Sequence, residues 1–335
     1  MAVVFMEGFD HLSAFQIVAE KGWTFASGAS LSVQTGRYAG QAIRPQSSEL
    51  AHPLPSNYAD TIVGDAIKLN GTALNSNLLT LKAGGGVVAA ARLVTSGAST
   101  VWRVVNSAGT TLATGTTPIV TGSGAWYYLE LKVHVSATVG TVELRMNGAP
   151  TAECSATGVN TGASNIDAVS VTGTTGFTDH DDIYVCDTSG SVPTNDFLGE
   201  VKVETLYPNG DGANTAWTGV YTDWDDPSVD DADATYVSSA TPNDRETSAL
   251  TNLATATGTV FAVQTNLTSR KDDAGTRTIA PVVRIGSTNY DGTTTAALGS
   301  SYADYTQLYD RLDPSGATWT ISTVNAMETG VKEIA

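Results

Sequence analysis

The stretch TDHDDIYVCD, residues 178–187, holds four aspartates, a histidine and a cysteine within ten positions. Carboxylate oxygens of Asp179, Asp181 and Asp182 could bind Ca²⁺, and His180 could bind a transition metal. The run lacks the D-x-[DN]-x-[DN]-G pattern of an EF-hand loop. Adjacent aspartates also accept hydrogen bonds from backbone N–H groups in turns. We therefore interpret the stretch as the polar entry of a loop into a strand, and Ca²⁺ is the alternative.

A second acidic cluster holds six aspartates in eleven residues. Two or three of these carboxylates could converge on a hard cation. A solvated acidic loop that covers a sheet edge or faces a basic partner would need no cation. We favour the loop, so the sequence predicts no metal site and no cofactor beyond the Ca²⁺ alternative. The aspartates are Asp223, Asp225, Asp226, Asp230, Asp231 and Asp233.

Two glutamates raise the question of catalysis. Glycosidases hold two carboxylates about 5–10 Å apart across the scissile bond. Glu200 and Glu204 lie four positions apart in GEVKVETL and would share one face of a strand. The same alternation is typical of a half-exposed strand, so we expect no enzyme. The four histidines, none of which accompanies a G-x-S-x-G motif, support no nucleophilic triad; they are His11, His52, His134 and His180.

Sugar binding is harder to dismiss, because lectin-like sandwiches use exposed aromatic side chains and polar loops. Aromatic residues make up only 7% of the chain, so few can be spared from the core. The candidates for sugar contact are Tyr38, Trp102, Trp126, Tyr127 and Trp224.

Composition limits the possible partners. The 335 residues include 34 acidic and 17 basic ones, a formal net charge of −17. Such a surface repels nucleic acid and anionic membranes, and no apolar run approaches the ~18 residues of a membrane span. The N-terminus lacks a signal-peptide pattern, so we expect synthesis and folding in a cytosol. Cys154 and Cys186 are expected to be buried thiols rather than a disulfide.

The elements that must position these residues are short strands, because apolar and polar residues alternate between turns rich in Gly, Asn and Ser. The clearest case is residues 124–148, an antiparallel hairpin with one buried and one wet face, ending at Asn147-Gly148. Residues 165–173 and 181–190 are expected to form a further hairpin-like pair. Residues 197–208 are expected to form a long strand stopped by Pro208. We predict two all-β sandwich domains, residues 1–208 and 209–335.

Residues 1–207 resemble the concanavalin A-like, laminin-G-like jelly-roll domains of tailed-bacteriophage structural proteins. The segments that carry the resemblance are VVFMEGFDHL, GRYAGQAIR, WYYLELKVHV with GTVELRMNG, and DDIYVCDTSGSVPTNDFLGEVKVETLYP. The second half is similar to the module that follows such jelly rolls, through DDADATYV, KDDAGTRTIAPVVR and TWTISTVNAMETGV.

The resemblance implies a concanavalin A-like jelly roll followed by a smaller β-sandwich. It also implies a non-enzymatic structural protein of a phage virion, assembled in the host cytoplasm as a homo-oligomer docked on other virion proteins. The alternatives are an adhesin module that binds a host-surface glycan and a polysaccharide depolymerase.

Overall fold

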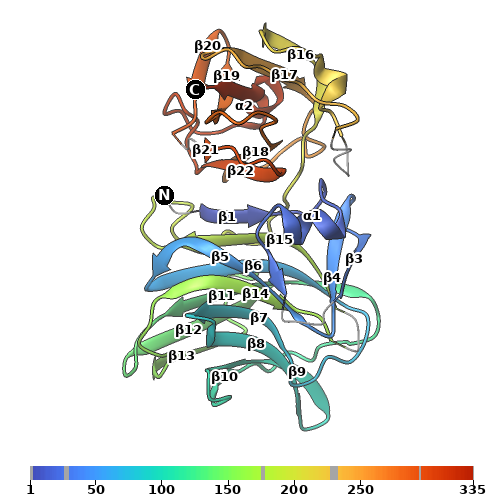
Figure 1. The fold of residues 1–335 in the computed structure, drawn as a ribbon. Coiled ribbons are helices and arrows are strands. Elements are labelled where there is room, and N and C mark those ends of the chain that lie inside the picture. The colour runs from blue at the N-terminus through green and yellow to red at the C-terminus, as the bar shows by residue number, and fades with distance from the viewer. Residues whose placement is uncertain (1–2, 26–29, 175–177, 227–232, 294–295, 335) are drawn as a thin grey trace. The chain divides into compact units, whose positions relative to one another are not determined.

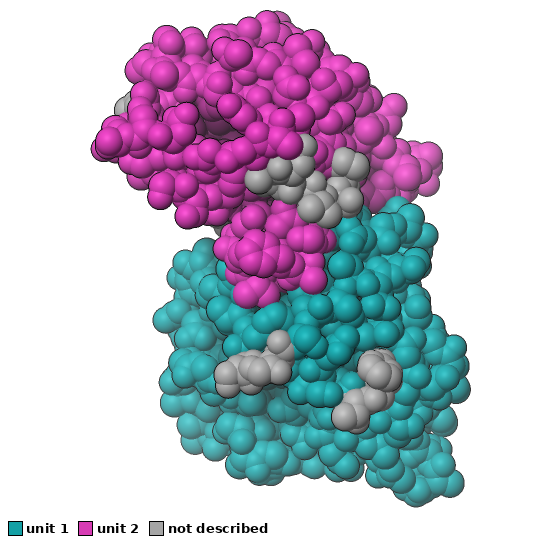
Figure 2. All heavy atoms as spheres, turned by 45° about the vertical axis from the view of Figure 1, so that its right-hand side comes forward, with its two compact units in different colours: residues 1–10, 22–203 teal, residues 11–21, 204–335 magenta. Residues whose placement is uncertain are grey.

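The computed structural model describes residues 3–25, 30–174, 178–226, 233–293 and 296–334. The chain divides into two compact units (Figures 1 and 2). Unit 1 consists of Met1–Asp10 and Gly22–Val203, and unit 2 of His11–Lys21 and Glu204–Ala335. The predicted boundary between residues 208 and 209 lies at the beginning of the first strand that follows unit 1.

Unit 1 is built from two antiparallel sheets, sheet A and sheet B. Sheet A runs in the order β13 (Cys154–Val159), β12 (Gly140–Met146), β11 (Ala125–His134), β6 (Asp60–Leu69), β15 (Thr178–Asp187), β4 (Gln41–Gln46) and β3 (Ser30–Thr35), and β1 (Val3–Glu7) pairs with β15. Sheet B runs in the order β10 (Thr111–Thr114), β9 (Ser99–Val105), β8 (Gly86–Ser96), β7 (Asn77–Ala83), β14 (Ile166–Thr172), β5 (Glu49–Tyr58) and β2 (Thr24–Phe25).

The core of unit 1 follows from strand alternation, because successive side chains of a strand point to opposite faces. Leu131 of β11 is fully buried and pairs with Leu144 on one side and Val63 on the other. The predicted hairpin of β11 and β12 is confirmed, and both Asn147 and Gly148 adopt positive φ beyond it.

Unit 2 is a smaller sandwich. Its larger sheet runs in the order β16 (Pro208–Thr215), β17 (Arg245–Leu250), β23 (Glu328–Glu333), β19 (Thr278–Ile285) and β20 (Thr288–Asp291), and β21 (Ala296–Ala297) pairs with β19. The strands β18 (Val263–Ser269) and β22 (Ala303–Tyr309) form a second sheet. Its core contains Val263, Val283, Trp319, Val324 and Met327.

The helices of the described residues are short. They are α1 (Ala14–Ala19), α2 (Ile321–Ala326) and the 3₁₀ turn η1 (Tyr221–Asp223). The helix α1 begins with a capping box, in which Ser13 and Gln16 bond to each other's backbone N–H groups. No helix in the described ranges is long and apolar enough to cross a membrane.

The predicted architecture, an all-β concanavalin A-like jelly-roll sandwich followed by a smaller β-sandwich, is confirmed by this topology. Both cysteines are free and buried in strands, as expected. Two local predictions are wrong. The strands β14 and β15 belong to different sheets instead of pairing, and residues 197–207 form no strand. That segment instead uses its backbone groups to bond to side chains of sheet A, as described below.

Candidate functional site

A buried polar cluster lies on the face of sheet A that points away from sheet B. Tyr128 and Glu130 of β11 belong to this outer face, because they alternate with Leu129 and Leu131 of the core. The hairpin was predicted to keep this face wet, which is wrong at these two positions, since both side chains are buried. Backbone of residues 198–203, which we call the crossing segment, supplies hydrogen-bond donors and acceptors to the cluster.

The ring of Tyr184 in β15 occupies space that a glycine in the neighbouring strand leaves open. Gly64 of β6 lies in register between Glu130 and Tyr184. A Cβ atom on Gly64 would lie 2.1 Å from the Tyr184 ring, so the glycine leaves room for the ring. The Tyr184 hydroxyl donates to Glu130 Oε1, and Gly199 N–H donates to the same oxygen at 2.8 Å. The Leu198 N–H donates to the Tyr184 hydroxyl at 3.3 Å.

The aspartates of TDHDDIYVCD lie inside a strand. The whole stretch forms β15 and is buried up to Cys186, so the interpretation as a loop that enters a strand is wrong. The pairing of β15 with β6 shifts register between Asp181 and Tyr184, and Asp182 has φ of 53°. This is a β-bulge, which re-aims side chains locally. Both carboxylates accept backbone N–H groups, in keeping with the expected role of such aspartates.

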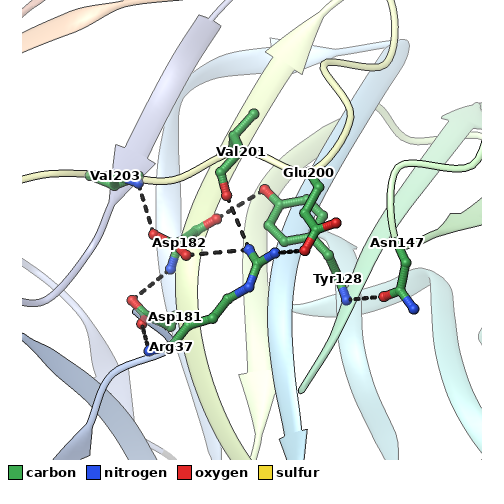
Figure 3. Close-up of polar contacts among 8 residues, drawn as sticks. All are labelled: Arg37, Tyr128, Asn147, Asp181, Asp182, Glu200, Val201 and Val203. Carbon is green, nitrogen blue, oxygen red and sulfur yellow. Dashed lines mark hydrogen bonds and ion pairs between the residues drawn. The ribbon is translucent and has the colours of Figure 1, made fainter. Parts of the chain in front are cut away.

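Arg37 connects the bulge to the crossing segment (Figure 3). Its backbone N–H donates to Asp181 Oδ2 at 2.8 Å. Its guanidinium donates to Glu200 and, at 3.1 Å, to the Val201 carbonyl oxygen, and Nη1 lies 3.4 Å from Asp182 Oδ2. Asp182 also accepts the Val203 N–H at 2.8 Å. Arg37 therefore binds both the bulge and the crossing segment, each of which is more than 140 positions away from it in the sequence.

Burial governs the electrostatics of the cluster. It raises the pKa of Asp181 to about 9, with a further contribution from the neighbouring charge of Asp182. It raises the pKa of Asp182 to about 6, against the backbone N–H of Val203 and the charge of Arg37, which lower it. Burial also raises the pKa of Glu130, while the hydrogen bond from Tyr184 lowers it. These carboxylates therefore favour the protonated form more than solvent-exposed ones do.

Other polar residues of β15 are also paired. Asp179 accepts Arg44 Nε at 2.5 Å and Asn70 Nδ2 at 2.9 Å. His180 points to the inner face, where its Nδ1 lies 2.7 Å from Asp65 Oδ2. Within the described residues, no three His, Cys, Asp or Glu side chains are grouped to hold a metal ion.

The two glutamates considered for catalysis have separate roles. Glu200 of unit 1 is bonded to Arg37. Glu204 of unit 2 accepts the Ala254 N–H at 2.8 Å and the Thr255 side chain and backbone. The expectation that they share one face of a strand is wrong, because residues 200–207 form no strand.

The histidines are dispersed through the fold. His52 stacks on Phe5, with ring centroids 4.3 Å apart. His134 Nδ1 lies 2.9 Å from Asp60 Oδ1. His11 is buried, and burial lowers its pKa to about 3.

The second acidic cluster is only partly described. Asp230 and Asp231 lie outside the described residues. Asp223 Oδ2 accepts the Val220 N–H at 2.9 Å, and Asp233 Oδ1 lies 2.7 Å from Arg270 Nη2. The two aspartates therefore have different partners.

Among the candidate sugar-binding aromatics, Tyr38 stands apart. Trp102 is fully buried, the Tyr127 hydroxyl is bonded to Val120, and Trp126 is partly buried beside Lys68. Trp224 is also partly buried. Tyr38 is 57% exposed.

Tyr38 has charged side chains on its ring. The Arg37 guanidinium carbon lies 4.7 Å from the ring centroid, and Lys202 Nζ lies 5.5 Å from it. The carboxylate of Glu200, whose side chain is 42% exposed, is bonded to the same arginine. Sequence reasoning identified Tyr38 and Glu200 but missed Arg37, since nothing in GRYAG distinguishes a clamping arginine from a solvated one.

The chain matches no protein-family profile, and no curated protein matches it. Among solved structures it is similar to domain 4 of AbnA, an extracellular arabinanase from Geobacillus stearothermophilus in complex with arabinotriose. The identity is 15%, with 56% of this chain and 92% of that chain covered and a TM-score of 0.37. It is also similar to metal-free lectin I-B4 from Griffonia simplicifolia, at 12% identity, 54% and 98% coverage and a TM-score of 0.34.

The binding domain of Paraclostridial Mosquitocidal Protein 1 is a further similar structure, at 13% identity, 75% coverage of both chains and a TM-score of 0.38. Similarities this weak carry no information about the ligand or activity of this chain. The resemblance to phage structural proteins is untested by them and stays a prediction.

Proposed function

We propose that unit 1 is a non-catalytic carbohydrate-binding module in which Tyr38 is the platform for a sugar ring. The Tyr38 ring, which is 57% exposed and has the Arg37 guanidinium 4.7 Å and Lys202 Nζ 5.5 Å from its centroid, is the observation that carries this proposal. Aromatic faces pack against the apolar C–H face of a sugar, and nearby polar groups bond to its hydroxyls. Glu200 supplies an acceptor and Lys202 a donor beside the ring.

Rigidity of the platform supports the proposal. Binding sites gain affinity when their groups need no ordering on association. The Arg37 guanidinium lies against the Tyr38 ring and is itself fixed by Asp182 and Val201. The backbone of residue 37 is fixed by Asp181. A sugar on the Tyr38 ring would therefore meet a surface that is already ordered.

Binding of oligosaccharides to the full chain, measured by glycan array and then calorimetry, tests the proposal. Tyr38→Ala is expected to weaken binding at least tenfold, because it removes the stacking surface. Tyr236→Ala is the matched control, since Tyr236 is 56% exposed in unit 2. Equal losses in both variants, or no binding by the unmodified protein, would overturn the proposal.

The absence of catalysis is part of the proposal and has its own assay. The protein is expected to release no reducing ends from a polysaccharide that it binds. Release that Glu200→Gln abolishes would instead favour the depolymerase alternative.

A structural role in a phage virion is the second candidate, supported by the sequence segments that resemble phage structural proteins. The two roles are compatible, since a virion surface protein can present a glycan-binding module. Electron cryomicroscopy of purified virions tests this role, because a structural protein would occupy regular density. Its absence from the particle would exclude the virion role but leave glycan binding standing.

A further inference from the structure

Two arginines face each other on the outer side of sheet B. Arg92 of β8 and Arg103 of β9 are directly opposite in the antiparallel register. The next pair in this register, Leu93 and Trp102, is fully buried and points to the core. Alternation therefore places both arginines on the face that points away from sheet A.

Neither arginine has a carboxylate partner among the described residues. Arg92 donates through Nε and Nη2 to Asn77 Oδ1, at 3.0 and 2.5 Å. Arg103 donates through Nε to Thr114 Oγ1 at 3.2 Å. Both acceptors are neutral, so the two positive charges stay uncompensated.

This pairing is unusual for the chain. Acidic residues outnumber basic ones by 34 to 17. Arg44, Arg145 and Arg245 each lie within ion-pair distance of a carboxylate. Like charges directly opposite each other destabilise a sheet. The pKa of Arg92 is lowered by burial and then by the charge of Arg103.

We propose that Arg92 and Arg103 together bind one oxyanion, a carboxylate or a sulfate, between their guanidinium groups. The Nη1 group of Arg92 and both Nη groups of Arg103 have no hydrogen-bond partner in the part of the chain that the structure describes. Guanidinium groups bind carboxylate and sulfate-like oxyanions through paired, charge-assisted hydrogen bonds. A bound anion would also remove the repulsion between the two charges.

The neutral partners fix the two side chains for this role. Asn77 Oδ1 accepts two hydrogen bonds from Arg92, and Thr114 Oγ1 accepts one from Arg103, so both side chains are oriented before an anion arrives. The site lies on sheet B, whereas Tyr38 belongs to the cluster on sheet A. Either site can therefore exist without the other.

NMR of the arginine Nε–H groups in the full chain tests the proposal at low ionic strength, where screening is weak. Sodium sulfate, sodium glucuronate and uncharged glucose are titrated separately. We expect saturable shifts at Arg92 and Arg103 with at least one of the two anions and none with glucose. Tighter binding of glucuronate would indicate a sugar-borne carboxylate, and tighter binding of sulfate a free inorganic anion.

Substitutions separate a specific site from general screening. Arg92→Gln and Arg103→Gln are each expected to weaken anion binding at least tenfold. Arg277→Gln is the control, since Arg277 already has Asp273 as its partner at 2.7 Å. Shifts that do not saturate, or an affinity that is unchanged in Arg103→Gln, would overturn the proposal. If a variant fails to fold, the unmodified protein still tests the proposal, because glucuronate should shift the arginine signals and glucose should not.

Discussion

His180 Nδ1 lies 2.7 Å from Asp65 Oδ2, and both side chains are fully buried between the sheets of unit 1. The two residues come from β15 and β6, which are neighbours in sheet A. Burial raises the pKa of Asp65, and the charge and hydrogen bond of His180 lower it. A buried pair of this kind is costly to break on one side only, because the remaining polar group loses its partner.

Asp65→Leu and His180→Leu are each expected to lower the free energy of unfolding by about 3–5 kcal/mol. The double variant should lose less than the sum of the two, because neither Asp65 nor His180 is then left without the other. Chemical denaturation of the four proteins gives the coupling energy. A coupling near zero would mean that the two side chains do not depend on each other.

Arg37→Met is expected to loosen the crossing segment. The change removes the hydrogen bonds from the guanidinium to Asp182, Glu200 and the Val201 carbonyl. A hydrogen bond to a charged group contributes about 1.5–3 kcal/mol to stability. The Val203 amide should then exchange with solvent about 10 to 100 times faster, as measured by hydrogen exchange. Arg270→Met, which removes a contact to Asp233, should leave that amide unchanged.

The raised pKa values predict a pH dependence of stability. Asp181 and Asp182 titrate at about 9 and about 6 in the folded chain, above the usual value near 3.8. The folded state therefore holds protons more tightly than the unfolded state. The stabilisation is complete below about pH 4 and is lost as the pH rises through the folded pKa values.

Denaturation at pH 5, 6, 7 and 8 measures the slope of the free energy of unfolding against pH. This slope can reach about 1.4 kcal/mol per pH unit for one proton. Asp181→Asn is expected to flatten it, whatever its effect on absolute stability, because the variant cannot titrate there. Asp291→Asn is the matched control, since Arg245 lowers the pKa of Asp291 below its usual value, so this carboxyl is ionised in both states at pH 5–8 and its loss should leave the slope unchanged. An unchanged slope in Asp181→Asn would contradict the assignment.

Arg103→Thr is expected to stabilise the anion-free protein by about 0.2–1 kcal/mol, because it removes a like charge opposite Arg92. Threonine is also well suited to a strand. Thermal unfolding in a buffer without sulfate or carboxylate measures the change. Arg145→Thr should have the opposite effect, since Arg145 is paired with Glu143 and stacks on Phe197.

Alternation of apolar and polar residues was sufficient to predict the β11–β12 hairpin, because its register depends on neighbouring residues. Residues 197–208 show the same alternation and yet form no strand up to residue 207. Their partners lie far away in the sequence, since Arg37 is 163 positions from Glu200. Local pattern cannot distinguish a strand from a segment whose backbone bonds to distant side chains.

The candidate site could be predicted only in part for the same reason. Tyr38 and Glu200 have the residue types that binding needs, but their common neighbour Arg37 appears only in the fold. The burial of Tyr128 and Glu130 could not be predicted either. Alternation indicates which face of the strand a residue lies on, but not which other segment covers that face. Gly64 likewise matters only because the Tyr184 ring lies over it.

Unit 2 includes His11–Lys21 as well as Glu204–Ala335. Within it, Lys21 Nζ lies 3.2 Å from Asp304 Oδ2, and both side chains are almost fully buried. Lys21 is made before Gly22–Val203 of unit 1, and Asp304 is made after them. Unit 2 can therefore complete its folding only after the chain of unit 1 has been made, and a fragment that begins at residue 204 would carry Asp304 without its cation.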